Sequence, residues 1–510
     1  MEYSNRLERT APEQVGLDSR GVLAYLDYLE RSGTEMHGLM ILRRGKVAAE
    51  GWWAPYSPAL RHNSWSLSKS YVATAVGAAC SRGLLRLDDP ILRYFAAEAP
   101  AQPSPELQRL QIRHLLSMSC GMEPERLDWS EDWIRRFFAT PILHEPGSTF
   151  FYNNEASTIL AVLVERVTGR PLIDFLMEAV LEKIGVRREE ISCIRLRDGS
   201  SFGAAGIFST TEANARLGQL YLQKGCWNGE QVLPAQWVRE ASSKHVEVSF
   251  PKMAEMKGPM RKMRFEHAQA GYGYQMWMCA YPEAFRFDGA MGQYVAVLPT
   301  QDLVVAISES STASPDGPMC ALNALFDYLV PALDNGAEPD PEAQQLLQKR
   351  LAGLSLPRLT EGTAGTHAAA PEAFALEGPA PISLVPDIFA HLVGRPAPMQ
   401  TLSLTFDQEQ CRLRWTDAAG EHRLNAGMDG LPRLNMLSLG LPIAGYASAQ
   451  AAWTGASQLS VQIRYPETCF SMLLQLELGE TPSLTRCENL TFDGSPVKPV
   501  TAALRRIPQR

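Results

Sequence analysis

The sequence predicts an α+β protein of two parts, in which an antiparallel sheet flanked by helices is followed by a smaller antiparallel β domain. Two observations predict this fold class. Over most of the chain, apolar runs joined by short turns alternate with stretches in which apolar residues recur at helical spacing. Towards the end, apolar residues instead alternate at period two, as in half-buried strands. The chain has 510 residues and is 45% hydrophobic, which is enough for more than one core.

Each element of the larger part has its own signal. The first two apolar runs flank a turn that contains Gly45 and predict paired strands. The next segment is rich in alanine and lacks proline, which favours a helix. Two later runs are continuously apolar around a turn, which predicts a hairpin of buried strands. In order, we expect strands at 39–42 and 47–52, helices at 71–85 and 159–167, strands at 295–298 and 303–307, and a helix at 319–330.

The composition changes near residues 334–341, where we place a domain boundary. Residues 1–335 would form the larger domain and residues 336–510 a β-rich accessory domain. A short helix is predicted at 342–351, and residues 360–366, which are poor in large apolar side chains, are typical of a linker or exposed loop. The alternating runs that predict strands lie at 402–406, 413–415, 459–463 and 470–478.

Charge and composition exclude several classes of function. The chain carries 48 basic and 56 acidic side chains, a net charge of −8, which argues against nucleic acid or anionic lipid as a partner. No segment approaches the ~20 apolar residues that span a membrane, and the N-terminus lacks the apolar core of a secretory signal, so we expect a cytoplasmic protein. The nine cysteines include no Cys-x-x-Cys pair and the nine histidines form no cluster, so we expect no metal site and reduced thiols.

A Ser-x-x-Lys tetrad, Ser66 to Lys69, precedes the alanine-rich helix. Residues three apart share a helix face, so the amine can reach the hydroxyl. Serine becomes a nucleophile when a base takes its proton, and a lysine serves as that base when burial or a neighbouring charge lowers its pKa. Taken alone, such a tetrad more often marks a solvated helix surface. Residues 249–252 and 495–498 also match it, but both contain an internal proline and are set aside.

A second motif, Tyr152-Asn153-Asn154, strengthens the first. A tyrosine near a lysine can relay protons to and from a serine, and the Asn154 amide can accept from the lysine and donate to a substrate carbonyl. The similar triplet at residues 3–5 lies in an N-terminus that would fray, so we reject it. Alone, Tyr152 would be interpreted as a structural tyrosine. Together with Ser66 and Lys69, it predicts a catalytic group.

In combination these motifs resemble those of serine β-lactamase-like and penicillin-binding-protein-like hydrolases. The nearest branch is the class C β-lactamase-related group, which includes carboxylesterases and amide hydrolases. The stretches at 84–90, 112–122 and 292–299 also resemble this family, and the resemblance covers roughly residues 10–330. It implies a β-lactamase-like fold with a helical lobe between and after the first two motifs.

The third motif of the family is usually Lys-Thr-Gly or His-x-Gly, and its counterpart here is Phe287-Asp288-Gly289. The cation that helps to hold a substrate carboxylate is missing from this triplet, which should disfavour anionic β-lactams. Gly289 still allows close approach of the backbone. By resemblance, the N–H groups of Ser66 and Ala290 would form the oxyanion hole that stabilises a tetrahedral intermediate.

Other signals carry weaker alternatives. Residues 199–203 match the Gly-x-Ser-x-Gly pattern, but no clear strand precedes them and no helix follows, so a glycine-rich turn is favoured. His62 and His114 either line the site or satisfy hydrogen bonds. Several aromatic residues would supply either an apolar substrate wall or core packing. These are Trp52, Trp53, Tyr56, Trp129 and Trp133.

We therefore expect a cofactor-independent serine hydrolase that forms an acyl-enzyme on an ester, an amide or a small peptide. Ser66, Lys69 and Tyr152 would be catalytic, and Asn154, Gly289 and Ala290 would bind substrate or the oxyanion. The partner would be a small-molecule substrate, with no nucleic acid and no membrane. The alternative is a non-catalytic ligand-binding or sensory protein with the same fold. The β domain would then bind the ligand. A further alternative is a β domain that only buttresses the catalytic domain or makes a homo-oligomer.

Overall fold

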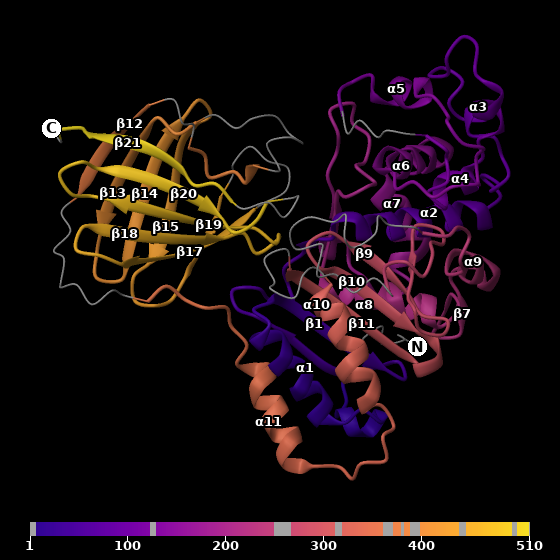
Figure 1. Cartoon of the computed structure of the whole chain (residues 1–510), viewed down its shortest axis with the longest axis horizontal. Coiled ribbons are helices and arrows are strands. Elements are labelled where there is room, and N and C mark those ends of the chain that lie inside the picture. Colours follow the sequence, from indigo (N-terminus) through magenta and orange to yellow (C-terminus); the bar gives the residue numbers. More distant parts are fainter. Residues whose placement is uncertain are drawn as a thin grey trace, which may run out of the picture. The chain divides into compact units, whose positions relative to one another are not determined.

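The computed structural model divides the chain into two compact units, which are described separately (Figure 1). The N-terminal unit comprises Met1–Trp52 and Ser57–Leu354, and the C-terminal unit comprises Trp53–Tyr56 and Ser355–Arg510. The separate roles expected for residues 1–335 and 336–510 stay predictions. The structure describes residues 7–122, 129–248, 267–311, 319–360, 371–378, 382–387, 398–437, 445–491 and 497–508.

A six-stranded antiparallel sheet forms the centre of the N-terminal unit, in the order β2-β1-β11-β10-β9-β8. The hairpins predicted from sequence are present, and every residue of β10 and β11 is buried, as their continuous apolar runs indicate. The strands are β1 (Glu35–Arg43), β2 (Lys46–Trp52), β8 (Trp277–Met278), β9 (Phe285–Gly289), β10 (Gln293–Leu298) and β11 (Leu303–Ser310).

Helices cover both faces of this sheet. Helix α8 (Thr211–Leu222) packs closely on one face, since a Cβ atom built on Gly218 would lie 2.6 Å from Val295 on β10. The preceding residue of β10 points the opposite way because side chains alternate along a strand. That residue, Tyr294, lies near Cys320 of α10 (Cys320–Ala324), which contacts α1 (Ser19–Arg31). The layers that the sequence predicted for this part are therefore present (Figure 1).

Several further helices form a lobe beside the sheet. The lobe contains α2 (Ser68–Ser81), α3 (Pro105–Arg109), α4 (Ile112–Leu116), α5 (Trp133–Ala139), α6 (Asn154–Thr168) and α7 (Leu172–Leu176). Helix α2 packs against α6 and is buried from Ser68 to Ala79. It ends before the predicted Leu85, because Gly83 adopts a left-handed φ of +70°. Among the helices of the described ranges, none combines the length and the apolar character that crossing a bilayer requires.

The predicted helix at 319–330 is interrupted. It begins as α10 and continues as a π-helical turn, η9 (Leu325–Leu329), and then as a 3-10 turn, η10 (Val330–Ala332). Pro331 lies in η10 and lacks the N–H group that a regular α-helix needs. Helix α11 (Pro341–Ala352), predicted at 342–351, then packs on α1 and β2.

The C-terminal unit is a ten-stranded antiparallel sheet that closes into a barrel-like arrangement through an additional pairing of β15 with β17. All four strands predicted from alternating residues are present, as β13, β14, β18 and β19. Most of the predicted linker, residues 361–366, lies outside the described ranges. The strands are β12 (Glu372–Glu377), β13 (Thr401–Phe406), β14 (Gln410–Asp417), β15 (Gly420–Gly427), β16 (Arg433–Met436), β17 (Tyr446–Trp453), β18 (Gln458–Arg464), β19 (Ser471–Glu477), β20 (Ser483–Glu488) and β21 (Val500–Arg506).

Candidate active site

Ser66 lies in a 3-10 turn, η2 (Trp65–Leu67), which leads directly into α2. The preceding residue, Trp65, has a φ of +47°, which is unfavourable for a bulky side chain and marks local strain. Its N–H group donates to Oδ1 of Asn63 at 2.7 Å, which helps to hold the turn. The turn leaves Ser66 partly exposed at the start of a buried helix, where free backbone N–H groups favour negative charge.

Lys69, on the first turn of α2, is 1% exposed, and the oxygen atoms of Ser66, Asn154 and Ala204 lie around its amine. Its Nζ lies 3.0 Å from Oγ of Ser66, 2.7 Å from Oδ1 of Asn154 and 2.8 Å from the carbonyl oxygen of Ala204. These contacts fix the amine within proton-transfer distance of the hydroxyl. In its uncharged form, an amine at this distance can accept the hydroxyl proton.

Tyr152 reaches the same place from the segment that precedes α6. Nζ of Lys69 lies 4.8 Å from the centroid of the Tyr152 ring, and that ring stacks on Trp277 with centroids 5.8 Å apart. Asn153 caps α6 by accepting from the Ala156 N–H at 2.7 Å, which fixes the entry of this segment. The fold thus brings the first two predicted motifs together, although their catalytic roles remain predictions.

The backbone of the third motif lies beside the serine turn. A Cβ atom built on Gly289 would lie 2.2 Å from the carbonyl oxygen of Ser64 and 3.2 Å from the backbone nitrogen of Leu67. Only glycine allows the end of β9 to approach η2 this closely. Because Ala290 follows directly, its N–H group lies near the turn that carries Ser66. This arrangement supports the predicted oxyanion hole and does not test it.

An arginine that sequence reasoning missed pairs with the third motif. Arg286 is 2% exposed, and its Nε donates to Asp288 at 2.6 Å. Burial raises the pKa of the Asp288 carboxyl, while the charges of Arg286 and Lys69 act in the opposite direction. The signal was present in the sequence, since residues two apart on a strand share a face. A buried cation therefore directly precedes the triplet and pairs with the acid of the triplet.

Two further features of the site were not predicted. Ala204 contributes only a backbone carbonyl, so its side chain gives no signal of this role in the sequence. It follows Gly203, where a Cβ atom would lie 2.6 Å from that of Ala161. Aromatic rings also gather around Tyr152, but they are not the ones considered above. They are Phe150, Tyr272 and Trp277.

The competing signals have structural roles. Ser201, of the Gly-x-Ser-x-Gly stretch, is buried, and its Oγ donates to Glu165 at 2.8 Å. The ring nitrogens of His62 contact His37 and the carbonyl oxygen of Asn63.

Two of the aromatic residues considered as a substrate wall, and the second histidine, likewise serve packing and helix capping. Trp133 is fully buried in the helical lobe, and Trp129 packs on it. Tyr56 belongs to the C-terminal unit. Burial lowers the pKa of His114 to about 4, and its Nδ1 accepts from the Gln111 N–H at 3.2 Å.

A buried carboxyl lies beneath the turn that joins β9 to β10. Glu309, on β11, is fully buried, and a Cβ atom on Gly292 would lie 2.0 Å from its Oε1. Burial raises the pKa of the Glu309 carboxyl well above its usual value, and the nearby Ser311 hydroxyl offsets part of this. The neighbouring phenols of Tyr25 and Tyr294 have raised pKa values too, so they stay neutral near neutral pH.

We expect Glu309 to make folding stability fall as pH rises. Its pKa is higher in the folded than in the unfolded protein, so its contribution is complete below about 4.5 and is lost as pH rises through the folded value. The side chain at this position cannot ionise in the Glu309→Gln variant, so the free energy of unfolding of this variant should vary less with pH than that of the wild type. Urea unfolding of both proteins across this range measures the difference, and parallel profiles would contradict the prediction.

Within the described ranges, no group of three or more His, Cys, Asp or Glu side chains is placed to hold a metal ion.

A family model for Beta-lactamase matches residues 27–326 of the chain. Among curated proteins, the 6-aminohexanoate-dimer hydrolase of Paenarthrobacter ureafaciens is 28% identical over 228 residues, covering 41% of this chain and 57% of that protein. Esterase EstB of Burkholderia gladioli is 29% identical over 143 residues, covering 24% of this chain and 36% of that protein. The chain thus matches between a third and just over half of these relatives' lengths.

Among solved structures, a candidate beta-lactamase from Bacteroides dorei aligns with 61% of this chain and 99% of its own, with a TM-score of 0.50 and 15% identity. At this identity, the likeness shows the fold and no more.

Proposed function

Because the chain belongs to the beta-lactamase family, we propose that it is a serine hydrolase that forms a covalent acyl-enzyme on an ester, an amide or a small peptide. The observation that carries the proposal is the distance of 3.0 Å between Nζ of Lys69 and Oγ of Ser66. The lysine that supplies this amine is buried. The similarity to an aminohexanoate-dimer hydrolase and to an esterase supports amides and esters as the substrate class.

In the first step, Oγ of Ser66 attacks the substrate carbonyl carbon and its proton passes to Lys69, directly or through Tyr152. The carbonyl electrons move to oxygen, where the N–H groups of Ser66 and Ala290 would stabilise the negative charge. Collapse of this intermediate breaks the bond to the alcohol or amine. The leaving group takes the proton held by Lys69 or Tyr152, and the acyl group stays on Ser66.

In the second step, water attacks the acyl carbonyl and gives a proton to the same base. The second tetrahedral intermediate collapses, the ester bond to Ser66 breaks, and Oγ regains its proton as the carboxylic acid leaves. Asn154 would orient the amine of Lys69 throughout, since its Oδ1 accepts from Nζ at 2.7 Å. The reaction consumes one water and needs no cofactor.

Tyr152→Phe should lower kcat by roughly a hundredfold or more, because the hydroxyl group that relays the proton is lost. The fold should stay intact, because the ring and its stacking on Trp277 remain. The measurement is kcat for an activated ester and for an amide, with the unfolding temperature as control. The amide rate should fall further, because an amine needs protonation in order to leave. Equal rates for variant and wild type would remove Tyr152 from the mechanism.

The acid of the third motif should select against anionic substrates. Asp288→Asn removes a carboxylate next to the site and leaves Arg286 with its positive charge, so kcat/KM for an ester that bears a carboxylate should rise by about tenfold. The rate for a neutral ester of the same size should change much less. A rise that is equal for both substrates would show that charge selection is not the role of Asp288.

The alternative, a ligand-binding protein without turnover, makes a different prediction for a panel of esters, amides and dipeptides. A hydrolase gives a burst of alcohol or amine, as the acyl-enzyme forms, and then steady turnover. If compounds bind but none of them gives product, even at a protein concentration equal to that of the substrate, the result would favour the binding protein.

A further inference from the structure

A second site lies in the C-terminal unit, on the outer face of two adjacent strands. The register of β17 and β18 places Ser448 opposite Arg464 and Gln450 opposite Gln462. These four side chains share one face, because residues two apart on a strand point the same way. The intervening Ile463 points to the other face and is fully buried. The polar face is thus separate from the apolar core of the unit.

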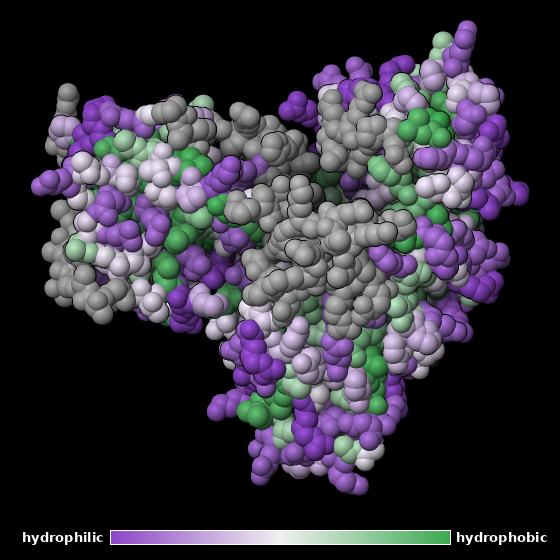
Figure 2. All heavy atoms as spheres, viewed as in Figure 1, coloured by the Kyte–Doolittle hydropathy of each residue, from purple (hydrophilic) through white to green (hydrophobic). Residues whose placement is uncertain are grey.

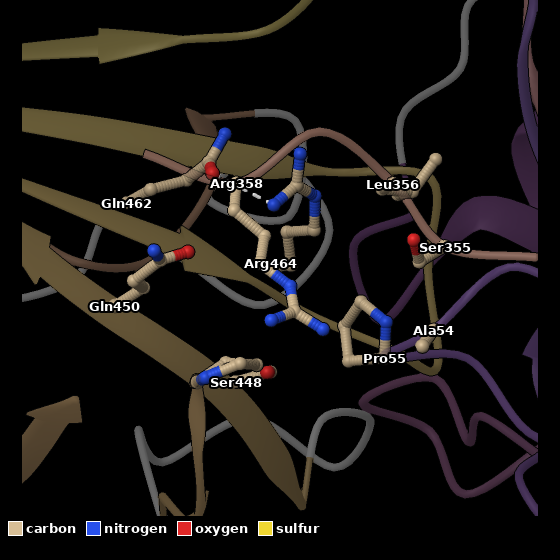
Figure 3. A pocket seen from close by; sticks show the side chains of 10 residues that line it. Ala54, Pro55, Ser355, Leu356, Arg358, Ser448, Gln450, Gln462 and Arg464 are labelled. Carbon is tan, nitrogen blue, oxygen red and sulfur yellow. Dashed lines mark hydrogen bonds between the residues drawn. The ribbon is translucent and has the colours of Figure 1, made fainter. Parts of the chain in front are cut away.

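Two chain segments cover this face and enclose a cavity of about 120 Å³ (Figure 3). Ala54 and Ser355 pair in a parallel bridge, which holds the two segments together. Gln450 binds the second segment, since its side chain donates to the carbonyl oxygen of Leu359 at 3.0 Å and accepts from the N–H of Leu359 at 3.3 Å. Because the amide of Gln450 is used in this way, it builds the wall of the cavity.

Arg464 is a buried cation with no carboxylate partner among the described residues. Its side chain lines the cavity and the residue is only 8% exposed. Nη1 donates to Oε1 of Gln462 at 2.7 Å and Nη2 to the carbonyl oxygen of Pro357 at 3.1 Å, whereas Nε is buried without a hydrogen-bond partner. In the described part of the chain it forms no ion pair. Burying a cation that lacks a counter-charge is costly, so this arrangement favours an anionic ligand.

Another buried arginine of the same unit, Arg486, has carboxylate partners, as buried cations usually do. Arg486 is 4% exposed, and its Nη2 pairs with Asp387 at 3.0 Å and with Glu488. Within its described ranges, the unit therefore supplies one buried arginine with two carboxylates from its own chain and supplies Arg464 with none.

A second guanidinium enters the same cavity. Arg358 is exposed, and its Nη1 donates to the carbonyl oxygen of Gly430 at 3.1 Å. Figure 3 shows its guanidinium extending into the space beside Pro55 and Ser448. No Asp or Glu is among the described residues that line the cavity. The lining thus holds two positive charges and no negative charge.

We propose that this pocket binds a small organic carboxylate through the guanidinium groups of Arg464 and Arg358. A guanidinium presents paired N–H donors that match the two oxygens of a carboxylate. The apolar part of the lining, which includes Pro55, Leu356 and Pro432, suits a short hydrocarbon stem and gives nothing to a fully polar anion such as phosphate. The site lies wholly within the C-terminal unit and does not depend on the proposed hydrolysis.

Calorimetric titration of the full chain tests the proposal, with Ser66→Ala as background so that hydrolysis adds no heat. The probes are butyrate, the uncharged butyramide of the same shape, and inorganic phosphate. Arg464→Met and Arg358→Met each remove one guanidinium. Arg423→Met is the matched control, because Arg423 is an exposed arginine of the same unit that pairs with Glu421 at 3.1 Å.

Butyrate should bind at one site and butyramide should not. Arg464→Met and Arg358→Met should each weaken butyrate binding by roughly tenfold or more, whereas Arg423→Met should leave it unchanged. Because Arg358 is exposed, its variant keeps the test valid if Arg464→Met fails to fold. Four results would overturn the proposal: no binding of butyrate, equal binding of butyramide, binding of phosphate in preference to butyrate, or unchanged affinity in both cavity variants.

Discussion

Ser66→Ala should lower kcat by roughly four orders of magnitude or more, because the residue supplies the nucleophile that forms the acyl-enzyme in the proposed reaction. A residual rate should persist, since the backbone N–H groups that would hold the oxyanion remain. The hydroxyl is partly exposed and its contact is with Lys69, so the unfolding temperature should change little. The measurement is steady-state hydrolysis of an activated ester.

Ser201→Ala is the matched control, because Ser201 lies in the competing Gly-x-Ser-x-Gly stretch. It is buried against Glu165, so the variant should keep its activity and lose about 1 kcal/mol of stability with the hydrogen bond. If Ser201→Ala were inactive and Ser66→Ala active, the assignment of the nucleophile would be wrong.

Lys69→Met should lower kcat by roughly a hundred- to ten-thousandfold, because methionine fills a similar volume and cannot accept the proton of Ser66. It should also destabilise the protein by about 1–3 kcal/mol, since Oδ1 of Asn154 and the carbonyl oxygen of Ala204 lose their donor. The measurements are the rate of ester hydrolysis and urea unfolding, so that the rate can be expressed per folded molecule.

A surface lysine provides the control for this charge change. Lys183 is exposed and pairs with Glu230 at 2.8 Å, so Lys183→Met should alter neither rate nor stability by more than a small amount. Activity of Lys69→Met within tenfold of the wild type, per folded molecule, would show that another group takes the serine proton.

Much of the fold could be predicted, because strong apolar patterns determine burial. The strands β10 and β11 were predicted from runs that had to be buried on both faces. Strand β17 was missed because alanine, serine and glutamine alternate along it, and these small or polar side chains give a weak pattern. Pro331 indicates the break in the helix predicted at 319–330. The apolar residues of this segment nevertheless recur at helical spacing, so a continuous helix was predicted.

The side chains of the site could be predicted and its electrostatic surroundings could not. Ser66, Lys69 and Asn154 were found from two short motifs, and the fold joins them by hydrogen bonds of 3.0 and 2.7 Å. The contact with Ala204 uses a backbone carbonyl, for which a sequence has no signature. Arg286 was missed because a charge two residues from the acid of the motif acquires meaning only once the strand and its buried face are known.

The central claim is that Ser66 is a nucleophile activated by Lys69. Labelling of the folded protein with a fluorophosphonate, in which the serine oxygen displaces fluoride from phosphorus, tests it most directly. Peptide mass spectrometry should find the phosphonyl group on Ser66 in the wild type, with labelling strongly slowed in Lys69→Met. A label on a different residue, or equal labelling of Ser66 with and without Lys69, would contradict the claim.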